Sequence, residues 1–138
     1  MTLTTTDWNY IKTNITNDDL SAYETLVGLH FSQELRDFLL AHNNGRPLLK
    51  GFDTAVSQGR VFDKLLSFNR GDTENVFTTY DSLKGELPAD LAPIIADPFG
   101  NYLCLVRSQR NYMVFWEAET GNVESIDNDL FELISKLR

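Results

Sequence analysis

APIIADPFGNYLCLVRSQRNYMVFWEAETGNVESI, residues 92–126, is the stretch of sequence that decides the fold class. It contains four short runs rich in β-forming residues, and turn-forming tetrapeptides separate these runs. Turns this short join strands that run in opposite directions, so the stretch predicts an antiparallel meander. The second run is apolar at every position, which is typical of a central strand covered on both faces. The predicted strands are 92–97, 102–106, 112–117 and 123–126, and the predicted turns are 98–101, 108–111 and 119–122.

Helical spacing and capping residues flank the meander. Thr16 and Asp19 have the spacing of a capping box, and Gly28 suits the end of the helix that they begin. Ser32 suits the N-cap of a further helix, whose apolar face includes His42. The predicted helices are a short one at 7–13, one from Thr16 to Gly28, one from Ser32 to Asn43, one capped by Asp72, and one after Asp127-Asn128. The predicted additional strands are 48–52 and 61–68, the second of which also fits a helix.

The chain predicts an α+β fold in a single domain over residues 1–138. Its 138 residues match the size of one domain, and 42% apolar with 12% aromatic residues can fill a core. We expect a central, mostly antiparallel sheet of about five to six strands flanked by about four to five helices. One cysteine cannot form an internal disulfide, and no run reaches the roughly 20 apolar residues of a membrane span, so we expect a cytoplasmic protein.

Acidic residues outnumber basic ones by 20 to 12, which gives a formal net charge of −8. Residues 111–134 include six acidic residues and no basic one, whereas residues 35–70 include six basic and three acidic residues. A nucleic-acid-binding surface needs cations to replace the phosphate counterions, so the charge argues against direct binding of nucleic acid. Two interpretations stay open: a basic protein partner attracted over a long range, or a charge that only keeps the protein soluble.

No arrangement typical of a catalytic or metal site occurs in the sequence. His42 lies on the apolar face of a predicted helix, His30 has no second ligand at metal-binding spacing, and Cys104 is central in an apolar strand. Asp97 begins a turn and Glu117 ends a strand, where solvated acids are ordinary. We therefore expect no catalytic residue, no metal and no cofactor. A small enzyme with carboxylate chemistry at Asp97 and Glu117 is the alternative.

An aromatic side chain next to acidic ones is a common arrangement in protein-binding hot spots. Trp116 shares a predicted strand face with Val114, and Glu117 and Glu119 follow it directly. These residues predict an anchor for a partner rich in arginine or lysine. The alternative is that Trp116 belongs to the core. A similar structural role is expected for Trp8, which should hold the first helix against the rest of the protein.

Several short motifs occur in an order that one known superfamily shares. They are Glu24 with Gly28-Leu29, Phe38-Leu39 with Asn44-Gly45, Asp97 with Gly100-Asn101, Met113-Val114-Phe115-Trp116, and a final helix with Phe131. In these motifs the chain resembles the SUKH superfamily, which includes the fungal Smi/Knr cell-wall regulators and many bacterial relatives. The resemblance covers about residues 20–137. Ser32 replaces a usual proline, Glu117-Ala118 replaces a frequent Asp-His, and residues 46–71 match the family pattern poorly.

The resemblance implies a binding protein with a SUKH fold. Bacterial members resemble immunity proteins that bind and block a cognate toxin domain, often a nuclease, whereas fungal members are regulatory scaffolds. Nuclease toxins tend to be basic, and the acidic stretch 111–134 fits such a partner. We expect a non-enzymatic immunity protein, monomeric or weakly dimeric, with no membrane contact; a regulatory scaffold is the alternative. The expected toxin-binding residues are Asp97, Trp116, Glu117 and Glu119, with Asp72 and Glu74 as outliers.

Overall fold

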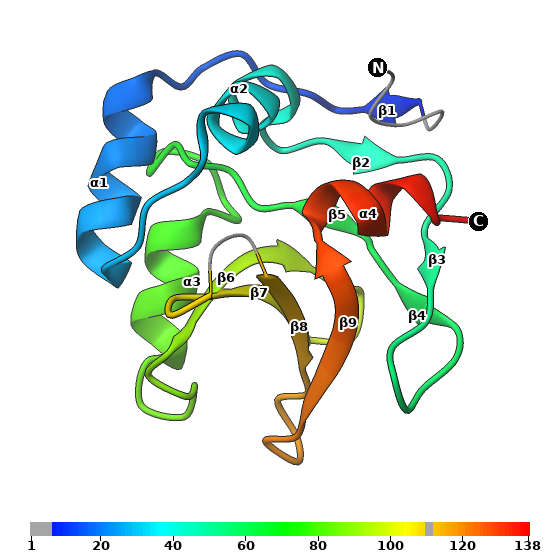
Figure 1. Ribbon diagram of the computed structural model, residues 1–138. Helices are drawn as coiled ribbons and strands as arrows, with labels where there is room; N and C mark the ends of the chain where they lie inside the picture. Colours follow the sequence, from blue (N-terminus) through cyan, green and yellow to red (C-terminus); the bar gives the residue numbers. More distant parts are fainter. Residues whose placement is uncertain (1–6, 110–111) are drawn as a thin grey trace.

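A five-stranded antiparallel sheet lies at the centre of the fold, in the strand order β5-β6-β7-β8-β9 (Figure 1). The structure is a computed structural model that describes residues 7–109 and 112–138. The strands are β5 (Lys64–Leu65), β6 (Leu91–Ala96), β7 (Tyr102–Val106), β8 (Tyr112–Trp116) and β9 (Val123–Asp129). Four of them form the predicted meander, because each pairs with the next along the chain. The predicted turn at 108–111 includes Arg110 and Asn111, which lie outside the described residues.

Four helices accompany the sheet in the part of the chain that the structure describes, so the predicted α+β class is confirmed. They are α1 (Asn17–Val27), α2 (Gln33–His42), α3 (Val76–Leu83) and α4 (Leu130–Ser135). In Figure 1, α1 and α3 lie along one side of the arched sheet, and α2 and α4 lie over its upper end.

The predicted caps of α1 and α2 are confirmed. The backbone N–H of Thr16 donates to a carboxylate oxygen of Asp19 at 2.9 Å, and Gly28 ends α1 in the left-handed conformation at φ 74°. The Ser32 hydroxyl oxygen accepts a hydrogen bond from the backbone N–H of Leu35 at 3.2 Å.

The predicted N-cap of α3 is corrected from Asp72 to Asn75. The Asn75 side-chain oxygen accepts a hydrogen bond from the backbone N–H of Thr78 at 2.9 Å, which satisfies a free donor of the first turn. The Asp72 side chain makes other contacts, which are described below.

The predicted helix at 7–13 is wrong, because this segment is extended. Strand β1 (Trp8–Asn9) pairs with β2 (Arg46–Pro47) in an antiparallel ladder. The Trp8 ring packs at 5.6 Å from Phe38 and 5.8 Å from Phe62, so its burial, rather than helical periodicity, sets the conformation. Tyr10 has φ 61°, a left-handed conformation that stops any helix here.

The region between α2 and α3 contains shorter strands than predicted. In place of strands at 48–52 and 61–68, the chain forms β3 (Gly51–Phe52), β4 (Arg60–Val61) and β5. Strands β3 and β4 form a small antiparallel pair, and β5 pairs with β6 in the central sheet.

Both faces of the central sheet are covered, as predicted for its middle strand. Leu103 and Phe115 lie in the main core with the helices, and Cys104 and Trp116 lie in a second apolar cluster on the opposite face. Cys104 is fully buried, and burial raises the pKa of its thiol far above the ordinary value. This thiol is therefore unreactive, as predicted.

Candidate protein-interaction site

Two turns at one end of the central sheet are joined through the side chain of Asp97. Its Oδ1 accepts hydrogen bonds from the backbone N–H groups of Phe99 (2.8 Å) and Asn101 (2.7 Å), and its Oδ2 accepts one from the Asn101 amide (2.9 Å). The Asn101 Oδ1 in turn accepts from the backbone N–H of Ala118 at 3.0 Å. The β6–β7 turn (97–101) is thereby tied to the β8–β9 turn (117–122). We call these two turns the turn edge.

Asp97 itself is only 7% exposed. Its carboxylate is occupied by three hydrogen bonds within the protein, so it positions the turn edge and has little surface left for a partner. We therefore expect Asp97 to position the turn edge for a partner and not to be a main contact residue.

The aromatic side chain of the turn edge is Phe99, which is not among the predicted contact residues. It is 77% exposed at the tip of the β6–β7 turn, and Gly100 beside it has φ 86°. A phenylalanine between Pro98 and a turn glycine has no strand position through which to enter the core. That pattern was visible in the sequence and could have identified Phe99 as a surface residue.

Trp116 is buried, which corrects its expected role as an exposed anchor. It is 1% exposed, and it lies in the second apolar cluster with Cys104 and Val114. The alternative interpretation, that Trp116 belongs to the core, describes this residue. Its indole Nε1 is buried without a hydrogen-bond partner among the described residues.

Glu117 belongs to a charged network that joins the turn edge to the β3–β4 loop. The Arg60 Nη2 lies 3.4 Å from a carboxylate oxygen of Glu117 and 2.7 Å from one of Glu124. The Arg60 guanidinium also lies over the Phe115 ring, 4.3 Å from its centroid. The other carboxylate oxygen of Glu117 accepts a hydrogen bond from the Thr120 hydroxyl at 2.7 Å. The charge of Glu117 is therefore partly compensated.

Glu124 is the buried acid of this network. Burial by itself raises the pKa of Glu124, but hydrogen bonds from Arg60, Thr54 and Ser57 outweigh it, so the pKa lies below the ordinary value. Thr54 donates to one carboxylate oxygen at 2.7 Å and Ser57 to the other at 3.1 Å. Glu124 is thus a structural anion with a full set of donors.

Glu119 and Glu74 are the predicted site acids with the greatest exposure. Glu119 is exposed on the β8–β9 turn. Glu74 is exposed before α3 and pairs with Lys64 at 3.3 Å. Burial raises the pKa of Tyr102 at the start of β7, and the charges of Glu74 and Asp97 raise it further. Because Lys64 pairs with Ala96, the residue before Asp97, Glu74 lies near the β6–β7 turn, and Lys64 partly compensates its charge.

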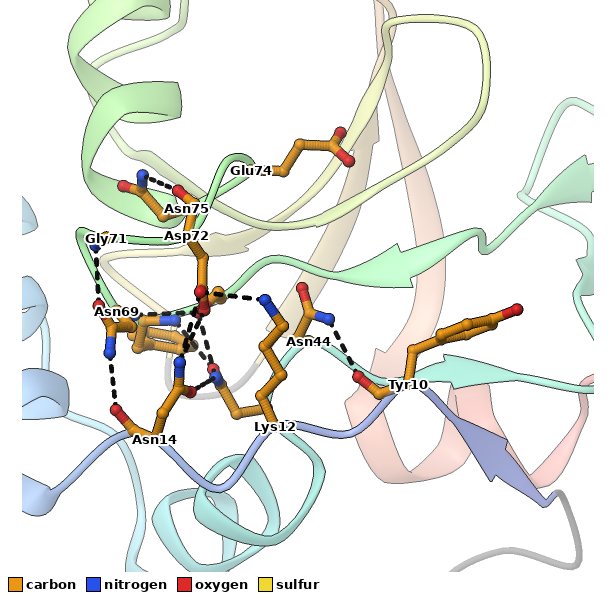
Figure 2. Close-up of polar contacts among 12 residues, drawn as sticks. Tyr10, Lys12, Asn14, Asn44, Asn69, Gly71, Asp72, Glu74 and Asn75 are labelled. Carbon is orange, nitrogen blue, oxygen red and sulfur yellow. Dashed lines mark hydrogen bonds and ion pairs between the residues drawn. The ribbon is translucent and has the colours of Figure 1, made fainter.

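Asp72 lies in a separate polar cluster, which Figure 2 shows. Its carboxylate accepts hydrogen bonds from the Lys12 ammonium (3.1 Å), the Asn14 amide (3.2 Å) and the Ser67 hydroxyl. The hydrogen bond from Ser67 is the main cause that lowers the pKa of Asp72; burial opposes it, and Asn14 and Lys12 add to it. In Figure 2 the Glu74 side chain points away from this cluster.

The Asp72 cluster fixes the N-terminal segment to the body of the protein. The Asn43 amide at the end of α2 donates to the Ser67 hydroxyl (3.1 Å) and to the Asn14 side-chain oxygen (3.3 Å). The Asp72 side chain is 12% exposed. The structure therefore does not bring Asp72 together with the turn edge, and its role is to hold segments of the chain together.

Replacing Asp72 with asparagine is expected to destabilise the protein by about 1–2 kcal/mol near neutral pH, because three hydrogen bonds lose their anionic acceptor. The folded-state pKa of Asp72 is lowered, so its stabilisation is present above the unfolded-state pKa and is lost as the pH falls through the folded-state value. The difference between wild type and Asp72→Asn in urea denaturation should therefore shrink as the pH falls through the lowered folded-state pKa of Asp72. A difference that is constant with pH would contradict this role.

The two histidines have different surroundings. The His42 ring stacks on Phe38 at 4.2 Å, and its Nδ1 lies 2.9 Å from the Phe38 carbonyl oxygen, so it is a packed histidine as predicted. His30 is exposed between α1 and α2. Over residues 7–109 and 112–138, no group of three or more histidine, cysteine, aspartate and glutamate side chains could hold a metal ion.

A pocket of about 230 Å³ lies away from the predicted residues, between the β3–β4 loop, β9 and α4. Phe52, Ile126 and Leu133 contribute its apolar lining, and Asp53 and Arg138 form an ion pair at 2.8 Å on its rim. Because these two charges compensate each other, the pocket does not present one charge sign to a ligand. The candidate site of the protein is thus the turn edge, which is a surface and not a cleft.

These features define a small α+β domain with a candidate surface for protein interaction. Residues 17–134 match the family model SUKH_6, described as SMI1-KNR4 cell-wall, and the chain belongs to this family. The resemblance to the SUKH superfamily is thereby confirmed. No curated protein matches the chain. Among the described residues, no helix has the length and apolar character needed to cross a membrane.

The structure gives a physical reason for the first family motif. The Glu24 carboxylate accepts a hydrogen bond from the backbone N–H of Phe31 at 2.7 Å and pairs with the Arg36 guanidinium. Gly28 supplies the left-handed turn that brings the chain from α1 back to this carboxylate. Glu24 and Gly28 together therefore set the connection between α1 and α2.

Proposed function

We propose that this protein is a non-enzymatic immunity protein that binds a basic toxin domain, of the nuclease type, and blocks it. Family membership supports a domain of the Smi/Knr or immunity type. The observation that carries the proposal is the composition of the turn edge: Phe99 is 77% exposed, and the partly exposed Glu117 and the exposed Glu119 lie on the adjoining β8–β9 turn, which Asn101 ties to the turn that carries Phe99. The proposal places the interaction in the cytoplasm.

The roles of the turn-edge residues follow from their contacts. Phe99 is the apolar anchor, and Glu119 and Glu74 are the acids that attract and pair with cations of the partner. An exposed aromatic side chain near exposed acids combines a desolvated contact with long-range attraction, which raises the association rate at low salt. Asp97 and Trp116 support this surface from below and do not contact the partner.

The proposal is tested by co-expression of this protein with the product of the adjacent gene, scored by cell survival and by co-purification. Glu119→Lys is expected to weaken binding about tenfold or more and to reduce survival, because a cation then faces a basic partner. The loss in the association rate should be greatest at low salt, since the attraction is screened at high salt.

Glu86→Lys is the matched control. Glu86 is an exposed acid beyond α3, at the end of the central sheet opposite the turn edge, and its reversal changes the net charge equally. An equal effect of both reversals would mean that only net charge matters. Unchanged affinity in Glu119→Lys would overturn the assignment of the turn edge.

A regulatory scaffold of the Smi/Knr type is the second candidate, and the cell-wall description of the matching family favours it. A scaffold would co-purify with several cellular proteins and would not rescue a cell that expresses the neighbouring gene product. Survival in the co-expression experiment separates the two functions.

A further inference from the structure

The loop between β3 and β4, residues 53–59, presents a valine at its tip in a fixed conformation. Val56 is 77% exposed. The backbone N–H of Thr54 donates to the Ser57 carbonyl at 2.9 Å, and the Thr54 hydroxyl accepts from the backbone N–H of Ser57 at 2.9 Å. At the end of the loop, the Gly59 N–H donates to Asp53 at 3.0 Å. We call residues 53–59 the Val56 loop.

The Val56 loop is fastened to the edge of the central sheet. The backbone N–H of Ala55 donates to the Ser125 carbonyl of β9 at 2.9 Å. The hydroxyls of Thr54 and Ser57 both donate to the buried carboxylate of Glu124. A loop held by so many contacts loses little conformational entropy when its tip binds a partner.

The same network places the Val56 loop beside the turn edge. Arg60, directly after the loop, contacts Glu124 of β9 and Glu117 of the β8–β9 turn. Figure 1 shows the loop between β3 and β4 and the turn between β8 and β9 projecting from the same side of the molecule. Phe99 and Val123, two further exposed apolar side chains, lie on the turn edge and at the start of β9.

We propose that the Val56 loop is a second arm of the binding surface and that Val56 enters an apolar depression of the basic partner. This inference rests on the proposed function, because it assigns the same occupant to the enlarged surface. The charge near these side chains argues for that occupant, since the contact with Arg60 places Glu117 of the turn edge beside the Val56 loop, and the exposed Glu119 on the same turn favours a cationic rim. The Val56 loop would then determine which basic partner fits.

The test measures binding of the purified basic domain encoded by the adjacent gene to this protein. Val56→Ser is expected to weaken binding about tenfold, mainly through faster dissociation, because the apolar contact is lost at an unchanged charge. Leu48→Ser is the matched control, since Leu48 is also an exposed apolar residue but lies beyond β2, away from the turn edge. Thermal unfolding should be unchanged in both variants.

A second variant, Thr54→Val with Ser57→Ala, leaves Val56 in place and removes both hydroxyl donors to Glu124. Binding is expected to weaken several-fold, because the loop must then be ordered on association. If Glu119→Lys weakens binding and neither loop variant does, the inference is overturned and the proposed function stands. If the domain does not bind at all, both are overturned.

Discussion

Arg60→Met is expected to lower the free energy of unfolding by about 2–4 kcal/mol. This loss is larger than that for breaking an exposed ion pair and at or below that for breaking a fully buried one. The reason is the carboxylate of Glu124, which is buried and would lose the cation 2.7 Å away. Methionine can still pack against the Phe115 ring, so the loss reports mainly on charge. Urea denaturation near neutral pH measures it.

Two controls separate the effect of losing the ion pair from the effect of losing side-chain packing at Arg60. Arg60→Lys retains a cation and should lose less stability, although one ammonium cannot serve both Glu117 and Glu124 in the same way. Adding Glu124→Gln to Arg60→Met should recover part of the loss, because no buried charge then lacks a partner.

The effect of Arg60→Met should also depend on pH. The folded-state pKa of Glu124 is lowered by its hydrogen bonds, so the stabilisation is present above the unfolded-state pKa and is lost as the pH falls through the folded-state value. The difference between wild type and Arg60→Met should therefore diminish in acid. A loss below about 1 kcal/mol near neutral pH would show that solvent screens this pair like a surface one.

Asp97→Ala is expected to cost about 2–3 kcal/mol of stability and to weaken partner binding about tenfold. The substitution removes the acceptor of three hydrogen bonds from Phe99 and Asn101, and with it the link to Ala118. Phe99 would then be displayed on a mobile turn and would have to be ordered on binding. Denaturation and affinity measurements on one preparation test both effects.

Asp97→Asn distinguishes positioning from direct contact. Asparagine retains a side-chain oxygen for the two backbone donors and loses the acceptor of the Asn101 amide, so part of the stability and most of the affinity should remain if Asp97 only positions the turn. A large loss of affinity at nearly unchanged stability would instead mean that the Asp97 charge contacts the partner. Asp90→Ala, at the other end of β6, is the control and should change stability by no more than about 0.5 kcal/mol.

The elements that depend on local signals were predictable from the sequence. The meander followed from β-rich runs and turn residues, and the starts of α1 and α2 followed from Thr16 and Ser32, because a cap is a contact between near neighbours. The segment 7–13 was not predictable in this way. Its conformation depends on Trp8 packing against Phe38 and Phe62, which are distant in the sequence.

The candidate site was predictable only as a stretch of chain. Asp97, Glu117 and Glu119 lie at one end of the sheet, but alternation along β8 did not show which face would be covered, and Trp116 is in the core. The contribution of Arg60 could not be inferred, because its contacts with Glu117 and Glu124 cross more than fifty residues of sequence. Phe99 was the one missed residue whose local pattern already indicated exposure.

The inert thiol of Cys104 has a practical consequence, because Cys104 is the only cysteine of the chain. A cysteine introduced at an exposed position such as Glu86 would be the one group that reacts with a maleimide, without prior removal of the native thiol. A fluorophore or spin label attached there would report association with a partner directly.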